Sequence, residues 1–240
     1  GAEMGPLIND MPIYMNKSIA VKTGDTLTFK GIKKGCRCYV AFAGGIDVPV
    51  VMGSKSTFLK AGIGGYEGRA LKAGDILNIG IPAKLPLSFS ERKAENFYDY
   101  DGCKVKLRVV LGPQEDAFTS EGIDTLFFSE YSVTSNSDRM GYTLEGAAIR
   151  HRGSADIISD GISMGAIQVP SKGNPIIMMA DRQTTGGYTK IGNVVTVDLP
   201  KIAQAKPADK IIFEKISLSE AHKLYKSLEE KFILLKASFN

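Results

Sequence analysis

Apolar residues recur along the chain in short runs of strand length, separated by glycines and prolines. Each run either alternates with polar residues or is continuous over four to seven positions, which is typical of β-strands. The runs lie at residues 18–21, 26–29, 38–42, 105–111, 176–179, 194–197 and 211–216. Glycine and proline at short intervals between such runs favour barrels or sandwiches. The pattern therefore predicts a mainly β fold.

A helical pattern dominates only the C-terminal end. Ser219 precedes a run over residues 220–236 in which Ala221, Leu224, Leu228 and Phe232, with Tyr225, form one apolar stripe. A capping serine followed by apolar residues at this spacing predicts an amphipathic helix, which we expect to pack on a barrel end. Residues 114–118 and 124–129 carry weaker helical patterns.

Two segments of the chain resemble each other. KTGDTLTFKGI at 22–32 and KPADKIIFEKI at 206–216 both place an aspartate turn before an apolar strand that ends at Phe29 or Phe213. Such a repeat predicts two similar β domains, with the first lacking its opening strands.

Composition narrows the class of protein. With 240 residues and 43% hydrophobic content, the chain can form one large or two small domains. No segment approaches the ~20 apolar residues that span a bilayer, and the start lacks a signal-peptide pattern. The net charge of +4 is spread along the chain without interleaved aromatic residues. We therefore expect a cytoplasmic protein that binds neither membrane nor nucleic acid.

Cysteines and histidines do not form a recognisable site. Cys36, Cys38 and Cys103 make an odd number without CxxC spacing, which argues against a disulfide framework or a zinc site and leaves packing or partly exposed thiols. His151 and His222 lie far apart and outside any metal-binding or nucleophile motif. We expect no metal site within the chain.

The richest polar segment is GAIQVPSKGNPIIMMADRQTTGGYTKIG, residues 165–192. Its apolar run at 176–179 predicts a buried strand that ends in a polar loop. This loop supplies a carboxylate, a guanidinium, an amide and two hydroxyls, followed by two glycines that permit close backbone approach: Asp181, Arg182, Gln183, Thr184, Thr185, Gly186 and Gly187. The loop is suited to a small polar substrate, although a self-satisfied hairpin explains the same residues equally well.

Two further segments carry candidate chemistry. In AGGIDVPVVMGSKSTF, Gly44 and Gly45 precede a hydroxyl-rich turn at Ser54, without the spacing of a phosphate loop. Backbone N–H groups there can hold a carboxylate or bicarbonate, or the segment is a structural turn. In SDRMGYTLEG, Asp138 can act as a base and Arg139 can clamp a carboxylate, or the two form an internal salt bridge.

Five segments together resemble a known family. Three of them are described above: GGIDVPVVMGSKSTF, SDRMGYTLEG and GAIQVPSKGNPIIMMADRQTTGGYTKIG. The other two are FLKAGIGGYEGRALKAGDIL and LGPQEDAF. They resemble the KipA-like proteins, also described as the C subunit of 5-oxoprolinase, allophanate hydrolase subunit 2, or the carboxyltransferase domain of urea amidolyase. The resemblance implies a pair of cyclophilin-like β-barrel domains with a C-terminal helix. Subdomain A is expected at residues 1–110, N-terminally incomplete, and subdomain B at residues 111–240.

The same resemblance implies an activity. Similar proteins work with a KipI-like partner (the B subunit of 5-oxoprolinase) and a LamB/YcsF-like partner (the A subunit) to open 5-oxoproline to glutamate with ATP and magnesium. We expect the chain to be inactive without them. On this hypothesis Arg139 or Arg182 holds the substrate carboxylate, while Asp181, Gln183 and Thr184 bind the lactam amide. Asp138 and Asp181 are the candidate catalytic carboxylates.

Two alternatives follow from the same family names. One is a biotin-dependent carboxyltransferase acting on urea or a related amide; because the chain has no AMKM sequence, biotin would then be carried by another domain or protein. The other is a non-enzymatic antagonist of a KipI-like kinase inhibitor, for which a β surface rather than a cleft matters.

Overall fold

The chain folds into two compact units. A computed structural model describes residues 1–82, 89, 92–95, 100 and 102–238. The barrel unit comprises residues 1–16, 23–38 and 94–240, and the inserted unit comprises residues 17–22 and 39–93. The boundary predicted at residue 110 from the family resemblance remains a prediction.

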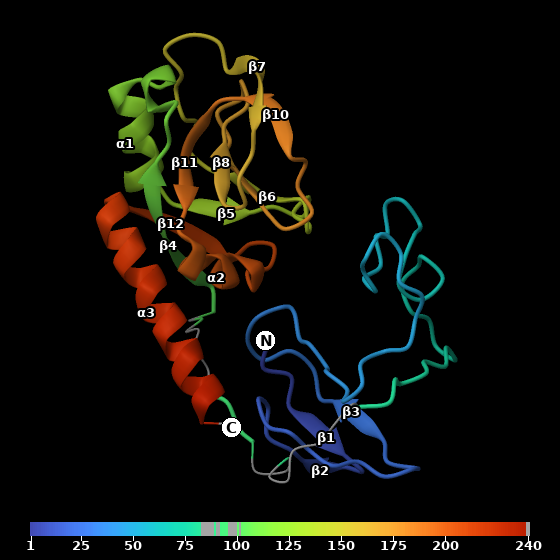
Figure 1. Cartoon of the computed structure of the whole chain (residues 1–240). Coiled ribbons are helices and arrows are strands. Elements are labelled where there is room, and N and C mark those ends of the chain that lie inside the picture. Colours follow the sequence, from blue (N-terminus) through green and yellow to red (C-terminus); the bar gives the residue numbers. More distant parts are fainter. Residues whose placement is uncertain (83–88, 90–91, 96–99, 101, 239–240) are drawn as a thin grey trace. The chain divides into compact units, whose positions relative to one another are not determined.

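A closed seven-stranded barrel forms the centre of the barrel unit (Figure 1). Its strand order is β11-β4-β12-β5-β6-β9-β8, in which β4 and β12 are parallel and the other paired neighbours are antiparallel. The strands are β4 (Lys104–Leu111), β5 (Tyr131–Val133), β6 (Gly141–Glu145), β8 (Ala166–Gln168), β9 (Ile176–Met178), β11 (Lys190–Val194) and β12 (Lys210–Lys215). The predicted mainly β fold with a barrel and a C-terminal helix is confirmed.

Alternation along β4 shows which face of the strand lies against the barrel core. Val105, Leu107 and Val109 are buried while Lys104 and Lys106 are exposed, because successive side chains of a strand point to opposite faces. The inward residues join one apolar core with members of other barrel strands. That core supports β6 and β9, next to which Arg139 and Asp181 lie.

Four of the predicted strands are confirmed, and three are wrong in whole or in part. The runs at 26–29, 105–111, 176–179 and 211–216 correspond to β3 (Leu27–Phe29), β4, β9 and β12. Residues 18–21 and 38–42 form no strand, and their apolar side chains such as Val21 and Tyr39 are mostly exposed. The run at 194–197 fails because β11 ends at Val194 and a 3-10 helix, η3 (Thr196–Asp198), follows.

The helices lie outside the barrel wall. They are η2 (Glu115–Ala117), α1 (Ser120–Phe128), α2 (Leu199–Ala203) and α3 (Leu218–Ala237). The predicted C-terminal helix is confirmed as α3, but its cap is Ser217, which exchanges hydrogen bonds with Glu220 in a capping box. No side chain of α3 is buried, and Tyr225 and Phe232 on its apolar stripe remain well exposed. The weak helical patterns at 114–118 and 124–129 correspond to η2 and the end of α1.

Two small sheets accompany the barrel. β1 (Pro6–Ile8), β2 (Met11–Pro12) and β3 form a three-stranded antiparallel sheet. β7 (Asp156–Gly161) and β10 (Thr185–Tyr188) form an antiparallel pair, which we call the ribbon. The predicted polar loop leads directly into this ribbon.

The turn of the sequence repeat has a third copy at residues 72–75. In each copy the third residue has a positive φ: +90° at Gly24, +90° at Gly74 and +74° at Ala208. In the second and third copies along the chain the aspartate carboxylate accepts from the backbone N–H three residues earlier, at 2.6 Å for Asp75 and 2.9 Å for Asp209. The second and third copies therefore share one turn geometry.

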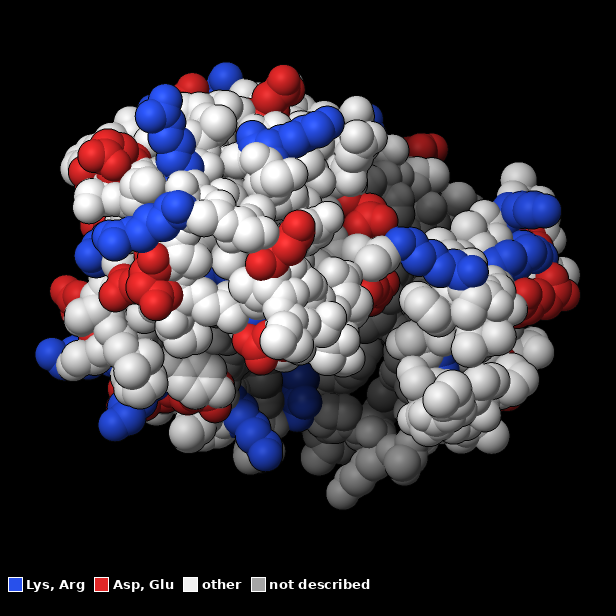
Figure 2. All heavy atoms as spheres, turned by 90° about the horizontal axis from the view of Figure 1, so that it is seen from above, with Lys and Arg blue, Asp and Glu red and all other residues white. Residues whose placement is uncertain are grey.

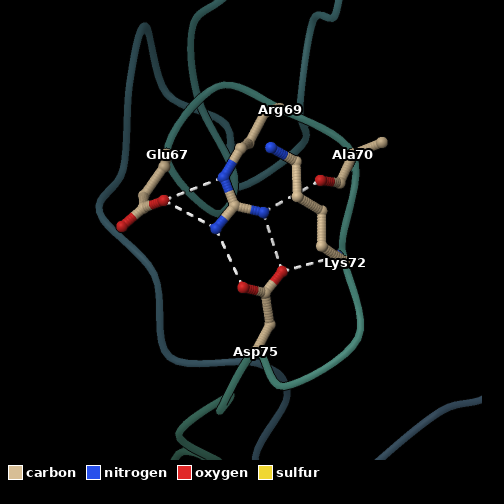
Figure 3. Close-up of polar contacts among 5 residues, drawn as sticks. All are labelled: Glu67, Arg69, Ala70, Lys72 and Asp75. Atoms are coloured by element: carbon tan, nitrogen blue, oxygen red, sulfur yellow. Dashed lines mark hydrogen bonds and ion pairs between the residues drawn. The ribbon is translucent and has the colours of Figure 1, made fainter.

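The inserted unit is held together by turns and polar contacts. None of its described apolar side chains is buried. Arg69 forks onto Asp75 at 2.7 and 2.9 Å and donates to Glu67 at 2.9 Å and to the Ala70 carbonyl (Figure 3). Its guanidinium also lies over the Tyr66 ring. The Arg69 hydrogen bonds lower the pKa of Asp75 to about 2.

Candidate functional site

The two predicted polar loops, one carrying Arg139 and the other Asp181 and Arg182, lie next to each other. Strands β6 and β9 pair with Gly141 opposite Met178, so the segment before β6 and the segment after β9 lie at the same end of the barrel. The backbone N–H of Asp181 donates to the Arg139 carbonyl at 2.8 Å, and that of Met179 donates to the Met140 carbonyl at 2.9 Å. Two candidates 42 residues apart in sequence are therefore neighbours.

Arg139 and Asp181 form a two-pronged ion pair. The guanidinium Nε and one terminal nitrogen lie 2.7 and 2.8 Å from the two carboxylate oxygens. An internal salt bridge was one of the two interpretations of this loop, but Arg139 makes it with Asp181. Because the Arg139 side chain is 61% exposed, the pair contributes little to stability and remains accessible to a ligand.

Asp138 and Arg182 are both directed at backbone atoms. One Asp138 oxygen accepts from the N–H groups of Met140 and Gly141 at 2.7 and 3.2 Å, which shapes the turn. Arg182 donates to the carbonyls of Ile162 at 3.0 Å and Met179 at 3.3 Å, and so ties the loop to the end of the ribbon. Their roles toward a substrate stay predictions.

The other loop candidates lead into the ribbon. Gln183 and Thr184 are exposed and precede β10, which contains Thr185, Gly186 and Gly187. Gly186 lies opposite Asp160 of β7. A side chain at Gly186 would begin 2.6 Å from Ile162 Cδ1 and 3.0 Å from Gln168 Nε2, with Gln183 Nε2 at 3.6 Å. This glycine therefore lets the ribbon approach the barrel, between two glutamine amides.

Buried polar residues under the ribbon were missed at the level of sequence. Gln168 and Lys190 are only 2% and 7% exposed, and they lie opposite each other on β8 and β11. The Lys190 ammonium is 2.9 Å from Asp160 Oδ2, and this hydrogen bond lowers the pKa of Asp160. The alternation of β11 gives no signal for Lys190, because the register of β11 against β8 shifts between Lys190 and Gly192.

His151 is packed beside this cluster. Its ring lies 4.6 Å from the Phe118 ring, and its Nε2 is 3.0 Å from Thr189 Oγ1. Burial lowers the pKa of His151, which favours the neutral imidazole at neutral pH.

The glycine turn of the inserted unit has an internal structural role. Gly44 and Gly45 have φ of +88° and +71°, and a side chain on Gly44 would overlap the Gly80 carbonyl. The Gly80 N–H donates to the Gly45 carbonyl at 2.9 Å. Ser54 Oγ accepts from the Ser56 N–H at 3.0 Å, as in a serine-stabilised turn. Binding of an anion by this turn stays a prediction.

Metal-binding and membrane-spanning features are not evident in the described part of the chain. Those residues contain no group of three or more His, Cys, Asp or Glu side chains that could hold a metal ion. None of the helices there combines the length and apolarity needed to span a bilayer. On the face drawn in Figure 2, cationic and anionic side chains are interspersed.

Comparisons with known proteins agree on the family. The carboxyltransferase domain family, subdomains A and B, matches residues 1–215. The C subunit of 5-oxoprolinase from Escherichia coli (strain K12) is 37% identical over 237 residues, which are 97% of this chain and 73% of that protein. Its counterpart in Haemophilus influenzae is 36% identical over 239 residues, covering 95% of this chain and 72% of its own length.

A solved structure extends the agreement to three dimensions. The K. lactis urea amidolyase superimposes with a TM-score of 0.87 and 30% identity over 98% of this chain and 15% of that one. Since the family match covers most of the sequence and the relatives agree along nearly its full length, this chain belongs to the carboxyltransferase domain family, subdomains A and B, and is homologous to the C subunit of 5-oxoprolinase and to the corresponding part of urea amidolyase.

Proposed function

We propose that the chain is part of an ATP-dependent 5-oxoprolinase that opens 5-oxoproline to glutamate together with KipI-like and LamB/YcsF-like proteins. The observation that carries this proposal is the extent of the match to the Escherichia coli 5-oxoprolinase C subunit, 37% identity over 97% of this chain and 73% of that protein. The name of that relative implies further subunits, so the proposed activity belongs to an assembly.

The chemistry of a lactam explains the need for ATP. A five-membered lactam is a poor electrophile, and phosphorylation of its oxygen supplies a leaving group and activates the carbon. The residues of this chain would bind and orient the substrate. A lactam presents one N–H donor and one C=O acceptor, which the amides of Gln168 and Gln183 beside Gly186 can match.

The nucleotide and magnesium are not assigned to particular residues of this chain. No described cluster of His, Cys, Asp or Glu suits a metal ion, and the sequence has no phosphate loop. The proposal gives the described residues of this chain binding and orienting roles, and ATP with magnesium is shared with the partner subunit.

A second candidate is biotin-dependent carboxyl transfer to urea or a related amide. The observation that favours it is the TM-score of 0.87 with the K. lactis urea amidolyase over 98% of this chain. Amide recognition at the ribbon serves either reaction, since urea and a lactam both offer N–H and C=O groups. Biotin would then be carried by another domain or protein.

The deciding experiment uses the chain assembled with its cognate KipI-like and LamB/YcsF-like proteins. We expect 5-oxoproline to stimulate ATP hydrolysis and to be converted to glutamate, measured by coupled ADP release and by chromatography. An assembly that leaves 5-oxoproline intact but carboxylates urea with carboxybiotin would replace this proposal with the second candidate.

The role of Arg182 can be tested in the same assembly. If Arg182 holds the substrate carboxylate, Arg182→Ala raises KM for 5-oxoproline, and Arg182→Lys, which keeps the charge, raises it less. Wild-type KM and kcat in Arg182→Ala would remove this residue from the site and leave it only its contacts with the carbonyls of Ile162 and Met179.

A further inference from the structure

Lys190 places a positive charge in the barrel wall under the ribbon. The residue is 7% exposed, and its backbone N–H donates to Gln114 Oε1 at 2.9 Å. Lysine is almost never this buried unless its ammonium is paired with an anion. What the site does therefore depends on which group supplies that anion and which part of the fold carries that group.

The anion is supplied by the ribbon. Asp160 of β7 presents one oxygen, Oδ2, to Lys190 Nζ at 2.9 Å and to Gln114 Nε2 at 3.2 Å. Its other oxygen accepts from the N–H of Gly161 at 2.7 Å. Two donors of different kinds thus converge on a single carboxylate oxygen.

The donors and the acceptor belong to different parts of the barrel unit. Lys190 begins a barrel strand, and Gln114 is fixed to it through the backbone hydrogen bond. Asp160 lies on the two-stranded ribbon, which pairs with no barrel strand in the described chain, and its side chain is 56% exposed against 9% for Lys190. Removing the carboxylate would leave the hydrogen bonds between the barrel strands in place, because Asp160 belongs to the separate two-stranded sheet.

Polar amides extend the site beyond the ion pair. The residue opposite Asp160 is Gly186, and no side chain projects there between the strands. The amides of Gln168 and Gln183 lie within 3.6 Å of the point where a side chain of Gly186 would begin. A carboxylate bound at Lys190 would therefore have amide donors and acceptors beside it.

We propose that Lys190 and Gln114 form a receptor for a small carboxylate, and that Asp160 is an internal carboxylate that occupies this receptor until a ligand displaces it. The ligand class is a small carboxylic acid that also carries an amide. The identification of 5-oxoproline as that ligand rests on the proposed function, whereas the proposal of a carboxylate receptor does not.

Direct binding to the full chain tests the receptor without requiring catalysis. The probes are 5-oxoproline, acetate, which has only the carboxylate, and 2-pyrrolidinone, which has only the lactam, each titrated by calorimetry. If Asp160 occupies the receptor about nine-tenths of the time, Asp160→Asn tightens carboxylate binding about tenfold. Lys190→Met abolishes carboxylate binding, and 2-pyrrolidinone responds to neither change.

Asp156→Asn is the matched control, because Asp156 is an exposed carboxylate on the same ribbon strand and is expected to leave binding unchanged. Far-UV circular dichroism confirms that each variant is folded, and the uncharged Lys190→Met/Asp160→Asn pair provides a second non-binding chain. Equal carboxylate affinity in the wild type and Asp160→Asn, or retained affinity in Lys190→Met, would overturn the proposal.

The outcomes separate this proposal from the proposed function. Lys190-dependent binding of acetate and 5-oxoproline supports the receptor even if the assembled complex releases no glutamate. Glutamate release by the complex, with carboxylate affinity that is indifferent to Lys190 and Asp160, would leave the function standing and remove the receptor.

Discussion

The turn at residues 206–209 in the barrel unit and the turn at residues 72–75 in the inserted unit share one pattern but have different surroundings. In both, the N–H of the first residue, a lysine, donates to the aspartate carboxylate three residues later, and the residue before the aspartate has positive φ. Asp209 is 4% exposed and leads into β12 of the core, whereas Asp75 is 15% exposed and leads to Ile76, which is 80% exposed.

The partners of the two carboxylates differ in the same way. Asp209 accepts from the Tyr100 hydroxyl at 2.5 Å and pairs with Lys206 at 2.6 Å, so it ties the chain before β4 to the start of β12. Asp75 pairs with Arg69 within one glycine-rich loop (Figure 3). Turn chemistry is therefore local, while the value of a turn for stability depends on what the following residues pack against.

The largest expected effect is in the barrel core. Leu107→Ala should lower the free energy of unfolding by about 2–5 kcal/mol, because Leu107 is fully buried and its truncation leaves a cavity. Urea denaturation followed by circular dichroism measures this. Ile76→Ala is the control in the inserted unit and should change little; an equal loss in both variants would contradict the contrast between the units.

The next effect concerns the two aspartates themselves. Asp209→Asn should lower the free energy of unfolding by about 1–3 kcal/mol, because it weakens hydrogen bonds to a buried carboxylate. Asp75→Asn should leave the global transition unchanged and increase proteolytic cleavage within the inserted unit. A larger loss of global stability in Asp75→Asn than in Asp209→Asn would contradict the comparison.

Acid should act on the barrel through Asp209. Burial raises the pKa of Asp209, but the hydrogen bonds from Lys206 and Tyr100 outweigh it and hold the pKa below the ordinary 3.8. The carboxylate therefore stabilises the fold fully above pH 3.8, and this contribution is lost as the pH falls through the lower folded-state pKa. Urea midpoints measured from about pH 7 to about pH 3 should fall less steeply in Asp209→Asn than in the wild type; parallel curves would show that Asp209 is not responsible.

The smallest effect concerns the third position of the turn. Ala208 has φ +74°, and the equivalent residues of the other two copies are Gly24 and Gly74. Ala208→Gly should stabilise the barrel by up to about 1 kcal/mol, because alanine is strained in this conformation and glycine is not. The greater conformational entropy of glycine in the unfolded chain offsets part of this gain. A lower melting temperature in this variant would show that the strain is relieved in another way.

Prediction of the fold from sequence succeeded where the hydrophobic pattern and the partner strands agree. The runs at 105–111 and 211–216 were recognisable because their alternation places Val105, Leu107, Ile211 and Phe213 on one side, and β4 and β12 do pair. The runs at 18–21 and 38–42 look equally strand-like, yet no strand pairs with them in the described chain. Alternation predicts a strand only when a neighbouring edge exists.

The candidate site, too, was recognisable from the sequence only in part. The loops bearing Arg139 and Asp181 were recognisable from their polar residues, but their pairing across 42 positions was not. Gln114, Asp160 and Lys190 stood out in no local pattern, because each becomes significant only when the ribbon lies over the barrel wall.

By itself, the sequence determined the aspartate turns, the C-terminal helix and the barrel strands β4, β9 and β12, because turn chemistry and apolar periodicity are local properties of the chain. Tertiary structure alone decided that Arg139 pairs with Asp181 and that Lys190 pairs with Asp160. The physical reason is that a charge can be buried only where folding delivers an opposite charge to it, and that delivery depends on strand order and register rather than on neighbouring residues.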